Sequence, residues 1–290
     1  MAVVLYGRRL PLHSRHRSPA CSAYWLGVGV NWAVVGASVV GSSHSHSSDP
    51  CQDSCFYHVT VDAAGASYLV ALAADGAGSA KFGEIGSEIA CETGGQTLLA
   101  EVERSGEGAF SPSLASRVLD AVQAKIESAA MEREVTTRDL ACTMLGAIIG
   151  PTQATYFQVG DGAIVARRDG VLSPVFWPES GEYANMTYFV TDANAAAHLR
   201  CETRDTTDEV ALFTDGLQRL ALVFATQTVH EPFFQPMFTV LRASSDDQTD
   251  ELCSALKRFL AGDAINERTD DDKTLILATR MSGAGSVGGV

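Results

Sequence analysis

The stretch LAADGAGSAKFGEIG, residues 72–86, decides how the rest of the chain is interpreted. Small and apolar residues lead to one carboxylate, Asp75, which is followed at once by a Gly-Ala-Gly turn. A carboxylate buried at the end of an apolar strand is costly unless a cation or a hydrogen-bond donor meets it. The sequence must therefore supply a partner for Asp75.

Other acidic residues repeat this placement at strand ends. Asp161 and Asp215 also follow predicted strands and precede glycine, Asp53 stands just ahead of a strand, and the run 270–272 leads into the last one. A single Asp-Gly pair is usually only a turn, but carboxylates that meet at one sheet edge repel each other. Hard divalent cations such as Mg²⁺ or Mn²⁺ relieve that repulsion, because they prefer oxygen ligands. We therefore expect Asp75 to bind metal.

Short β-branched runs alternate with segments of helical periodicity. The predicted strands are Trp32–Val40, Phe56–Val61, Tyr68–Ala74, Cys142–Ile149, Thr155–Val159, Ala163–Arg167, Tyr188–Thr191, Val210–Thr214 and Thr274–Thr279. Helices are predicted near 83–103, 113–134 and 245–263, and RRDG before Val171 indicates a hairpin. Because strands outnumber helices and follow each other closely, we expect a mainly antiparallel sheet with helices stacked outside.

Composition narrows the class of protein. The 290 residues are 46% hydrophobic and carry a formal net charge of −14, which argues against nucleic acid and anionic membranes as partners. The seven cysteines are odd in number and irregularly spaced. They predict no disulfide framework and therefore a reducing, cytoplasmic location.

The two ends differ from the middle. Residues 1–29 are rich in Arg and His and are predicted to be a disordered extension, and residues 282–290 a flexible tail. The apolar run at 25–40 raises the alternative of a signal peptide or membrane helix, but it is short and broken by glycines, which favours a strand. No linker divides residues 30–281, so we predict one domain there.

Six motifs in order resemble the type 2C metal-dependent protein serine/threonine phosphatases, in particular their compact bacterial branch. They are GSSHSHSSDPCQDS, ADGAGSAKFGEIGSEIA, RDLACTMLGAII, FQVGDGAIVARRDG, LFTDGLQRL and DDKTLILATR, and they lie within residues 32–280, over which the resemblance extends. The resemblance implies an α+β fold, a four-layer α/β/β/α sandwich of two antiparallel sheets flanked by helices. The implied reaction is direct attack of a metal-bridging water on phosphoserine or phosphothreonine in a protein that a cognate kinase has phosphorylated.

The same resemblance implies the site residues. Asp75 would bridge two Mg²⁺ or Mn²⁺ ions, and the Gly76 carbonyl would approach the same centre. Asp215 and Asp271 would complete one metal's shell, and Asp53 would hold the other through water, so that Asp53 and Asp75 carry the catalysis. Asp161, where the family usually reads Gly-Asp-Ser-Arg, would serve a third, weaker ion. A monomer is expected.

Two positions depart from the family pattern. Ala77 replaces the His of better-known members, and Ser48 replaces an Arg that grips phosphate. His44 and His46 lie near Ser48 and are candidates for binding substrate in its place. Thr143 is interpreted as a packed strand residue, and segment 177–210 as a substrate-facing flap.

Three alternatives stay open at this point. His44, His46, Cys51 and Cys55 have the ligand types of a zinc site. The departures at Ala77 and Ser48 are compatible with a catalytically silent domain that binds phosphoproteins or senses metal. The substrates could also be small phosphoesters, because specificity lies in surface loops.

Overall fold

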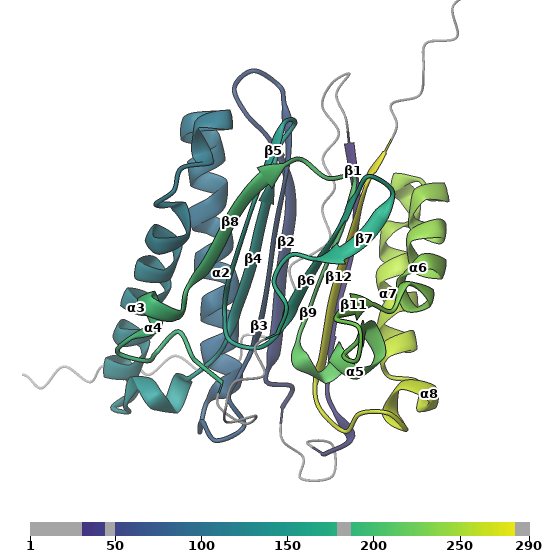
Figure 1. Cartoon of the computed structure of the whole chain (residues 1–290). Helices are drawn as coiled ribbons and strands as arrows, with labels where there is room; N and C mark the ends of the chain where they lie inside the picture. Colours follow the sequence, from purple (N-terminus) through teal and green to yellow (C-terminus); the bar gives the residue numbers. More distant parts are fainter. Residues whose placement is uncertain (1–30, 44–49, 179–186, 282–290) are drawn as a thin grey trace, which may run out of the picture.

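The computed structural model describes residues 31–43, 50–178 and 187–281 of the chain. Two five-stranded sheets lie face to face, and every pairing within them is antiparallel (Figure 1). The first sheet has the order β2-β3-β4-β5-β8 and the second β1-β12-β9-β6-β7. Helices cover the outer face of each sheet (Figure 1). The predicted α/β/β/α sandwich is confirmed.

The strands of the first sheet are β2 (Asp53–Val61), β3 (Ser67–Asp75), β4 (Met144–Ile149), β5 (Gln153–Val159) and β8 (Arg200–Asp205). Those of the second are β1 (Asn31–Val39), β12 (Lys273–Met281), β9 (Glu209–Phe213), β6 (Ala163–Arg168) and β7 (Val171–Pro174). A small ribbon pairs β10 (Leu222–Val223) with β11 (Thr228–Val229). The hairpin predicted between β6 and β7 is present, and its turn places Asp169 and Gly170 at positive φ.

The helices α2 (Gly83–Ser105) and α3 (Leu114–Arg133) pack on the first sheet, while α6 (Glu231–Ala243) and α7 (Thr249–Leu260) pack on the second. Short helices α4 (Ala195–His198), α5 (Gln218–Ala221) and α8 (Asp263–Asn266) lie in the connections. Four 3-10 turns complete the described elements: Gly106–Ala109, Thr137–Leu140, Asp215–Leu217 and Asp246–Gln248. No helix in the described ranges is both long and apolar enough to span a membrane.

Three apolar layers hold these elements together. One lies between the first sheet and its helices, around residues such as Leu72 and Val118, and another between the second sheet and its helices, around Phe213 and Phe238. The third fills the space between the sheets, where residues such as Leu145 are fully buried. Each buried side chain of this size stabilises the fold by about 1.5–3 kcal/mol, so the sheets form a rigid frame for the loops at their edges.

Several elements differ from the sequence-based prediction. Strand β8 was not predicted; it lies within segment 177–210, which was interpreted as a flap, and pairs with β5 at the edge of the first sheet. The strand predicted at Tyr188–Thr191 is wrong, because the Phe189 N–H donates to the Asp192 carboxylate and a turn forms there. Helix α6 was not predicted, since Pro232 and Pro236 are poor helix signals. Pro232 lies in the first turn, where a backbone N–H would have no partner within the helix, so proline costs little there. Pro236 lies inside the helix, and burial of the apolar face of α6 offsets its cost.

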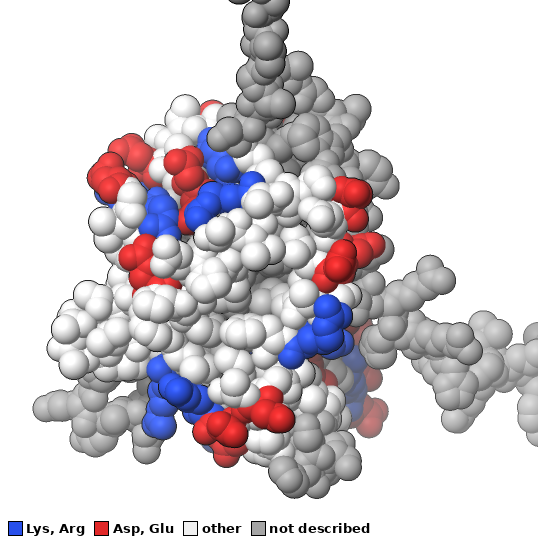
Figure 2. Space-filling model, turned by 90° about the vertical axis from the view of Figure 1, so that its right-hand side faces the viewer, with Lys and Arg blue, Asp and Glu red and all other residues white. Residues whose placement is uncertain are grey.

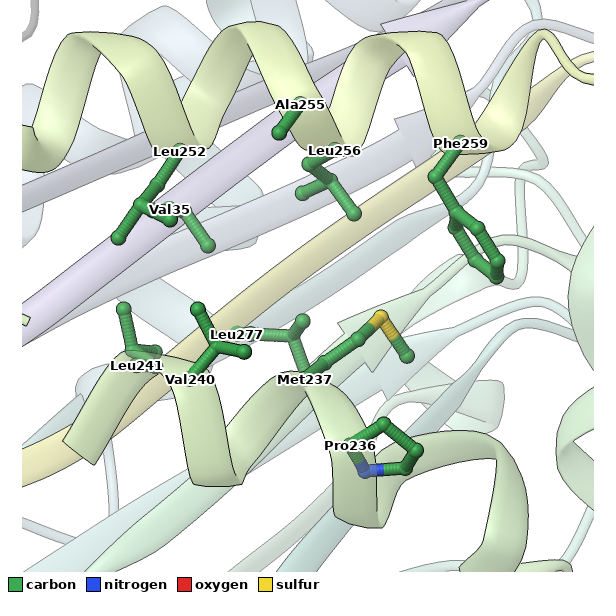
Figure 3. A pocket seen from close by; sticks show the side chains of 10 residues that line it. All are labelled: Val35, Pro236, Met237, Val240, Leu241, Leu252, Ala255, Leu256, Phe259 and Leu277. Atoms are coloured by element: carbon green, nitrogen blue, oxygen red, sulfur yellow. The ribbon is translucent and has the colours of Figure 1, made fainter. Parts of the chain in front are cut away.

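A groove opens between α6 and α7 on the outside of the second sheet (Figure 3). Val35 and Leu277, which are paired across β1 and β12, belong to its lining. Figure 2 looks onto this side of the molecule and shows uncharged surface between patches of charged residues. The lining residues are all apolar: Val35, Pro236, Met237, Val240, Leu241, Leu252, Ala255, Leu256, Phe259 and Leu277. Without an ionisable side chain, the groove offers no acid, base or metal ligand, so the chemistry must lie elsewhere.

Candidate metal centre

The fold brings the strand-end acids to one edge of the sandwich. Asp53 is the first residue of β2 and Asp75 the last of β3, and the two are directly paired in the antiparallel register. Asp215 follows β9, and Asp271 precedes β12, which pairs with β9. Asp161 lies in the turn between β5 and β6. Asp53 and Asp75, at strand ends of the first sheet, therefore lie at the same edge as the three acids next to strands of the second sheet.

The electrostatic effect of this arrangement appears in the carboxyl pKa values. Burial raises the pKa of Asp53 to about 8, although hydrogen bonds from Thr214 and Thr274 lower it. Burial, and then the charges of Asp161 and Asp271, raise the pKa of Asp215 to about 7. Burial also raises the pKa of Asp75 well above its ordinary value, and the charges of Asp53, Asp215, Asp271 and Asp161 add to the effect. The protein thus holds several carboxylates where their ionised forms are unfavourable unless a cation is present.

Hydroxyl groups fix the two central acids. The Thr214 hydroxyl donates to Asp53 Oδ2 at 2.7 Å and accepts the Thr274 N–H at 3.0 Å. The other oxygen of Asp53, Oδ1, is buried and has no hydrogen-bond partner in the structure. A buried carboxylate oxygen without a donor is costly, and it marks a place where a cation or its water fits.

Thr143 acts on the backbone of Asp75. Its hydroxyl accepts the Asp75 N–H at 3.0 Å, and its own N–H donates to the Asp75 carbonyl at 2.8 Å. Thr143 is 1% exposed, which agrees with its interpretation as a packed residue. Sequence reasoning missed the roles of Thr143 and Thr214. Thr214 directly precedes Asp215, and this position in the sequence could have indicated a role at the site. Its contact with Asp53, however, depends on how the two sheets face each other.

Two glycines allow the ligand-bearing loops to approach each other. A Cβ at Gly76 would lie 2.4 Å from the carbonyl carbon of Gly83, and one at Gly216 would lie 2.0 Å from the Asp272 carbonyl oxygen. Any larger residue at these positions would force the backbones apart. The Gly76 N–H also donates to the Gln52 carbonyl at 3.0 Å, which joins the segment after Asp75 to the one before Asp53.

Asp161 is held from both sides. Thr187 Oγ1 donates to Asp161 Oδ2 at 2.5 Å, and the Gln218 side-chain amide donates to the Asp161 carbonyl. Thr187 is the first described residue after the gap at 179–186, so the predicted flap segment reaches the acid cluster at this end. Further along the chain, the Val190 N–H donates to the Cys142 carbonyl, and the Val190 carbonyl accepts a hydrogen bond from the Gln123 side-chain amide.

The donors at this edge are all oxygens, the ligand type that a hard divalent cation requires. Within the described ranges, no three His, Cys, Asp or Glu side chains already stand together as a set that could hold an ion. Carboxylates that repel one another do not close on a shared point by themselves, and Mg²⁺ keeps several waters while taking only one or two carboxylates. The oxygen-only donors, the orphaned Asp53 Oδ1 and the glycine at position 76 fit a hard cation of this kind.

Several predicted residues remain without a described position. His44, His46 and Ser48 lie outside the described residues, so the phosphate-binding prediction and the zinc alternative stay untested there. Cys51 is half-buried and its thiol contacts the Asp53 carbonyl. Ala77 is 6% exposed and packs with Ala80 and Ala141, so this position offers no acid.

The comparisons agree with this geometry. The family model described as "Protein phosphatase 2C" matches residues 40–261. Serine/threonine-protein phosphatase 3 of Escherichia coli strain K12 is 39% identical over 250 residues, which is 86% of this chain and 98% of that protein.

Solved structures share the fold at low identity. The Staphylococcus aureus serine/threonine phosphatase Stp1 aligns with a TM-score of 0.54 at 15% identity, over 89% of this chain and 98% of the other. The catalytic domain of the serine/threonine phosphatase PstP was solved with two manganese ions. It aligns with a TM-score of 0.54 at 15% identity, over 87% of this chain and 99% of the other.

A helix-flanked pair of antiparallel sheets with acids gathered at one edge agrees with a metal-dependent phosphatase, and the family match shows this class. The chain belongs to the protein phosphatase 2C family. It is a serine/threonine phosphatase that depends on a divalent metal.

Proposed function

We propose that this protein dephosphorylates phosphoserine and phosphothreonine in proteins at the carboxylate cluster, with two core Mg²⁺ or Mn²⁺ ions and a third, weaker one. The observation that carries the assignment is the direct pairing of Asp53 with Asp75, together with Asp215 and Asp271 among the charges that raise the pKa of Asp75. A cluster of this kind is stable in its ionised form only around cations.

The proposed ligands follow from this arrangement. Asp75 would touch both core ions, with the Gly76 carbonyl beside it, while Asp215 and Asp271 would hold one ion and Asp53 the other. Asp161 would serve the third ion. When bound, such ions supply an acidic water as nucleophile and neutralise charge on the phosphoryl oxygens.

The chain's own residues orient this centre and keep it rigid. Thr214 fixes one oxygen of Asp53, while the other, Oδ1, is buried without a hydrogen-bond donor. Thr143 fixes the backbone at Asp75. Ala77 has no proton to give, so the proton for the leaving serine or threonine oxygen must come from another source. His44 and His46 are proposed to contact the phosphate.

The remaining features of the proposal concern the protein as a whole. We propose one phosphatase domain over residues 30–281, a monomeric state, and a phosphoprotein substrate supplied by a cognate kinase. The described cysteines form no disulfide with one another, which supports a reducing, cytoplasmic location.

The test measures phosphate release from a phosphothreonine peptide and from an aryl phosphate, with Mn²⁺ or with excess chelator. We expect release from both substrates with Mn²⁺ and none in chelator. Full activity in chelator would refute the metal assignment. Mn²⁺ binding without hydrolysis of either substrate would instead favour the catalytically silent domain, and hydrolysis of the aryl phosphate alone would favour a small phosphoester as substrate.

A further inference from the structure

The three consecutive acids at 270–272 have different environments. Asp270 and Asp271 are exposed at the edge of the sandwich, whereas Asp272 is 2% exposed. Asp272 Oδ1 accepts the Gly41 N–H at 2.6 Å, and its Oδ2 accepts the Gln52 N–H at 2.5 Å. These two bonds, which we call the Asp272 clasp, join Gly41, which follows β1, and Gln52, which precedes β2, to the start of β12.

The clasp is connected to three of the segments that carry a proposed core metal ligand, those of Asp53, Asp75 and Asp271. Gln52 directly precedes Asp53, and the Gln52 carbonyl accepts the N–H of Gly76, the residue after Asp75. The Asp272 N–H in turn donates to the Asp271 carboxylate at 2.9 Å. One buried carboxylate therefore sets the spacing of three segments that are far apart in the sequence.

The backbone on either side of Asp271 is held as firmly. Ser43 donates to the Asp270 carbonyl through its N–H at 3.0 Å and its hydroxyl at 2.6 Å. Gly41 packs so closely that a Cβ there would lie 2.3 Å from the same carbonyl oxygen. Charge-assisted bonds from a carboxylate to backbone N–H groups are among the strong ones, so the clasp is the part of this assembly that depends most on one side chain.

We propose that Asp272 is a positioning residue for the metal centre, which fixes the relative placement of Asp53, Asp75 and Asp271 without binding metal itself. The inference rests on the proposed metal ligands. Groups that orient metal ligands typically contribute 10- to 100-fold to metal affinity. Replacing Asp272 should therefore weaken metal binding even at temperatures where the variant is fully folded.

The test is Mn²⁺ binding by calorimetry, well below the melting temperature of each protein. Asp272→Asn keeps one acceptor oxygen but turns an amide N–H₂ toward a backbone donor, and we expect its Kd to rise about tenfold or more. Asp270→Asn is the matched control, since it removes the same charge on the other side of Asp271 from an exposed side chain. Its Kd should change about twofold at most, as expected for an exposed, screened charge.

An Asp272→Asn Kd equal to that of wild type would overturn the proposal, even if the metal-free melting temperature falls, because the role would then be structural only. Equal losses in both variants would also overturn it, since charge alone would explain them. Wild type that binds no Mn²⁺ would refute the proposed function as well.

A second measurement needs no variant. If the clasp and the metal centre are coupled, metal binding must strengthen the clasp in return. Amide hydrogen exchange of wild type should therefore slow at Gly41 and Gln52 when Mn²⁺ is added, by more than it slows in α3. Exchange that slows no more at these two amides than in α3 would contradict the coupling.

Discussion

Thr214→Val should destabilise the protein through the hydrogen bonds of one buried hydroxyl. Thr214 is fully buried, donates to Asp53 Oδ2 at 2.7 Å, and accepts the Thr274 N–H at 3.0 Å. Valine has nearly the same shape, so the packing is kept while both bonds are lost. A bond to a carboxylate contributes about 1.5–3 kcal/mol, and an unsatisfied buried N–H costs about 1–3 kcal/mol. After allowing for the added apolar burial, we expect a loss of about 3 kcal/mol.

The assay is urea unfolding of the metal-free protein at about pH 9, where Asp53 is ionised, together with thermal melting. A loss of about 3 kcal/mol corresponds to a fall in Tm of about 6–12 °C for a domain of this size. Thr155→Val is the matched control, because Thr155 is also fully buried but its hydroxyl bonds only the neutral Thr203 hydroxyl, at 2.8 Å. That variant should lose about 1 kcal/mol. If Thr214→Val loses no more than Thr155→Val, the hydroxyl does not hold Asp53 as described.

Three further predictions follow from the same structure. The pKa is raised to about 8 for Asp53 and to about 7 for Asp215, whereas a carboxyl in an unfolded chain has a pKa of about 4. The folded protein therefore holds these protons more tightly than the unfolded chain. The stability that the two groups contribute is full below about pH 4 and is lost as the pH rises through 7–8. The Tm in chelator should therefore fall between about pH 6 and about pH 8.5 and depend less on pH in saturating Mn²⁺; a rise in chelator would contradict the repulsion. Gly216→Ala should cost about 1–3 kcal/mol through overpacking against the Asp272 carbonyl, whereas Gly78→Ala, which has open space around it, should be nearly neutral in urea unfolding. Deleting residues 1–28 should leave Tm and turnover unchanged, because β1 begins at Asn31; aggregation or loss of turnover would show that the extension packs on the domain.

Much of the candidate site could be predicted from local sequence. Asp75, Asp161 and Asp215 each follow an apolar strand and precede glycine, and this pattern depends on nothing distant in the chain. The meeting of Asp53 with Asp75 needed only the expectation that neighbouring strands pair in antiparallel register. The number and spacing of strands and helices predicted antiparallel sheet with helices outside, whereas the division into two facing sheets came from the resemblance to the type 2C phosphatases.

The different environments of Asp270, Asp271 and Asp272 could not be predicted in the same way. The three residues are chemically identical, and which of them is buried depends on Gly41 and Gln52, more than 200 residues away in sequence. The same holds for Thr214, whose partner Asp53 belongs to the other sheet. Side-chain contacts between distant segments are set by tertiary packing, which local propensity does not encode.

The most direct test of the metal centre is the Asp75→Asn variant, compared with wild type for turnover of a phosphothreonine peptide and for melting with and without Mn²⁺. Asp75 is the proposed ligand of both core ions, so its loss should reduce turnover on the order of a thousandfold. Without metal the variant should melt no lower than wild type, because one of several repelling carboxylates is gone, and the rise in Tm on adding Mn²⁺ should shrink. Wild-type turnover in Asp75→Asn would show that Asp75 is only a turn residue and that the metal centre is wrongly assigned.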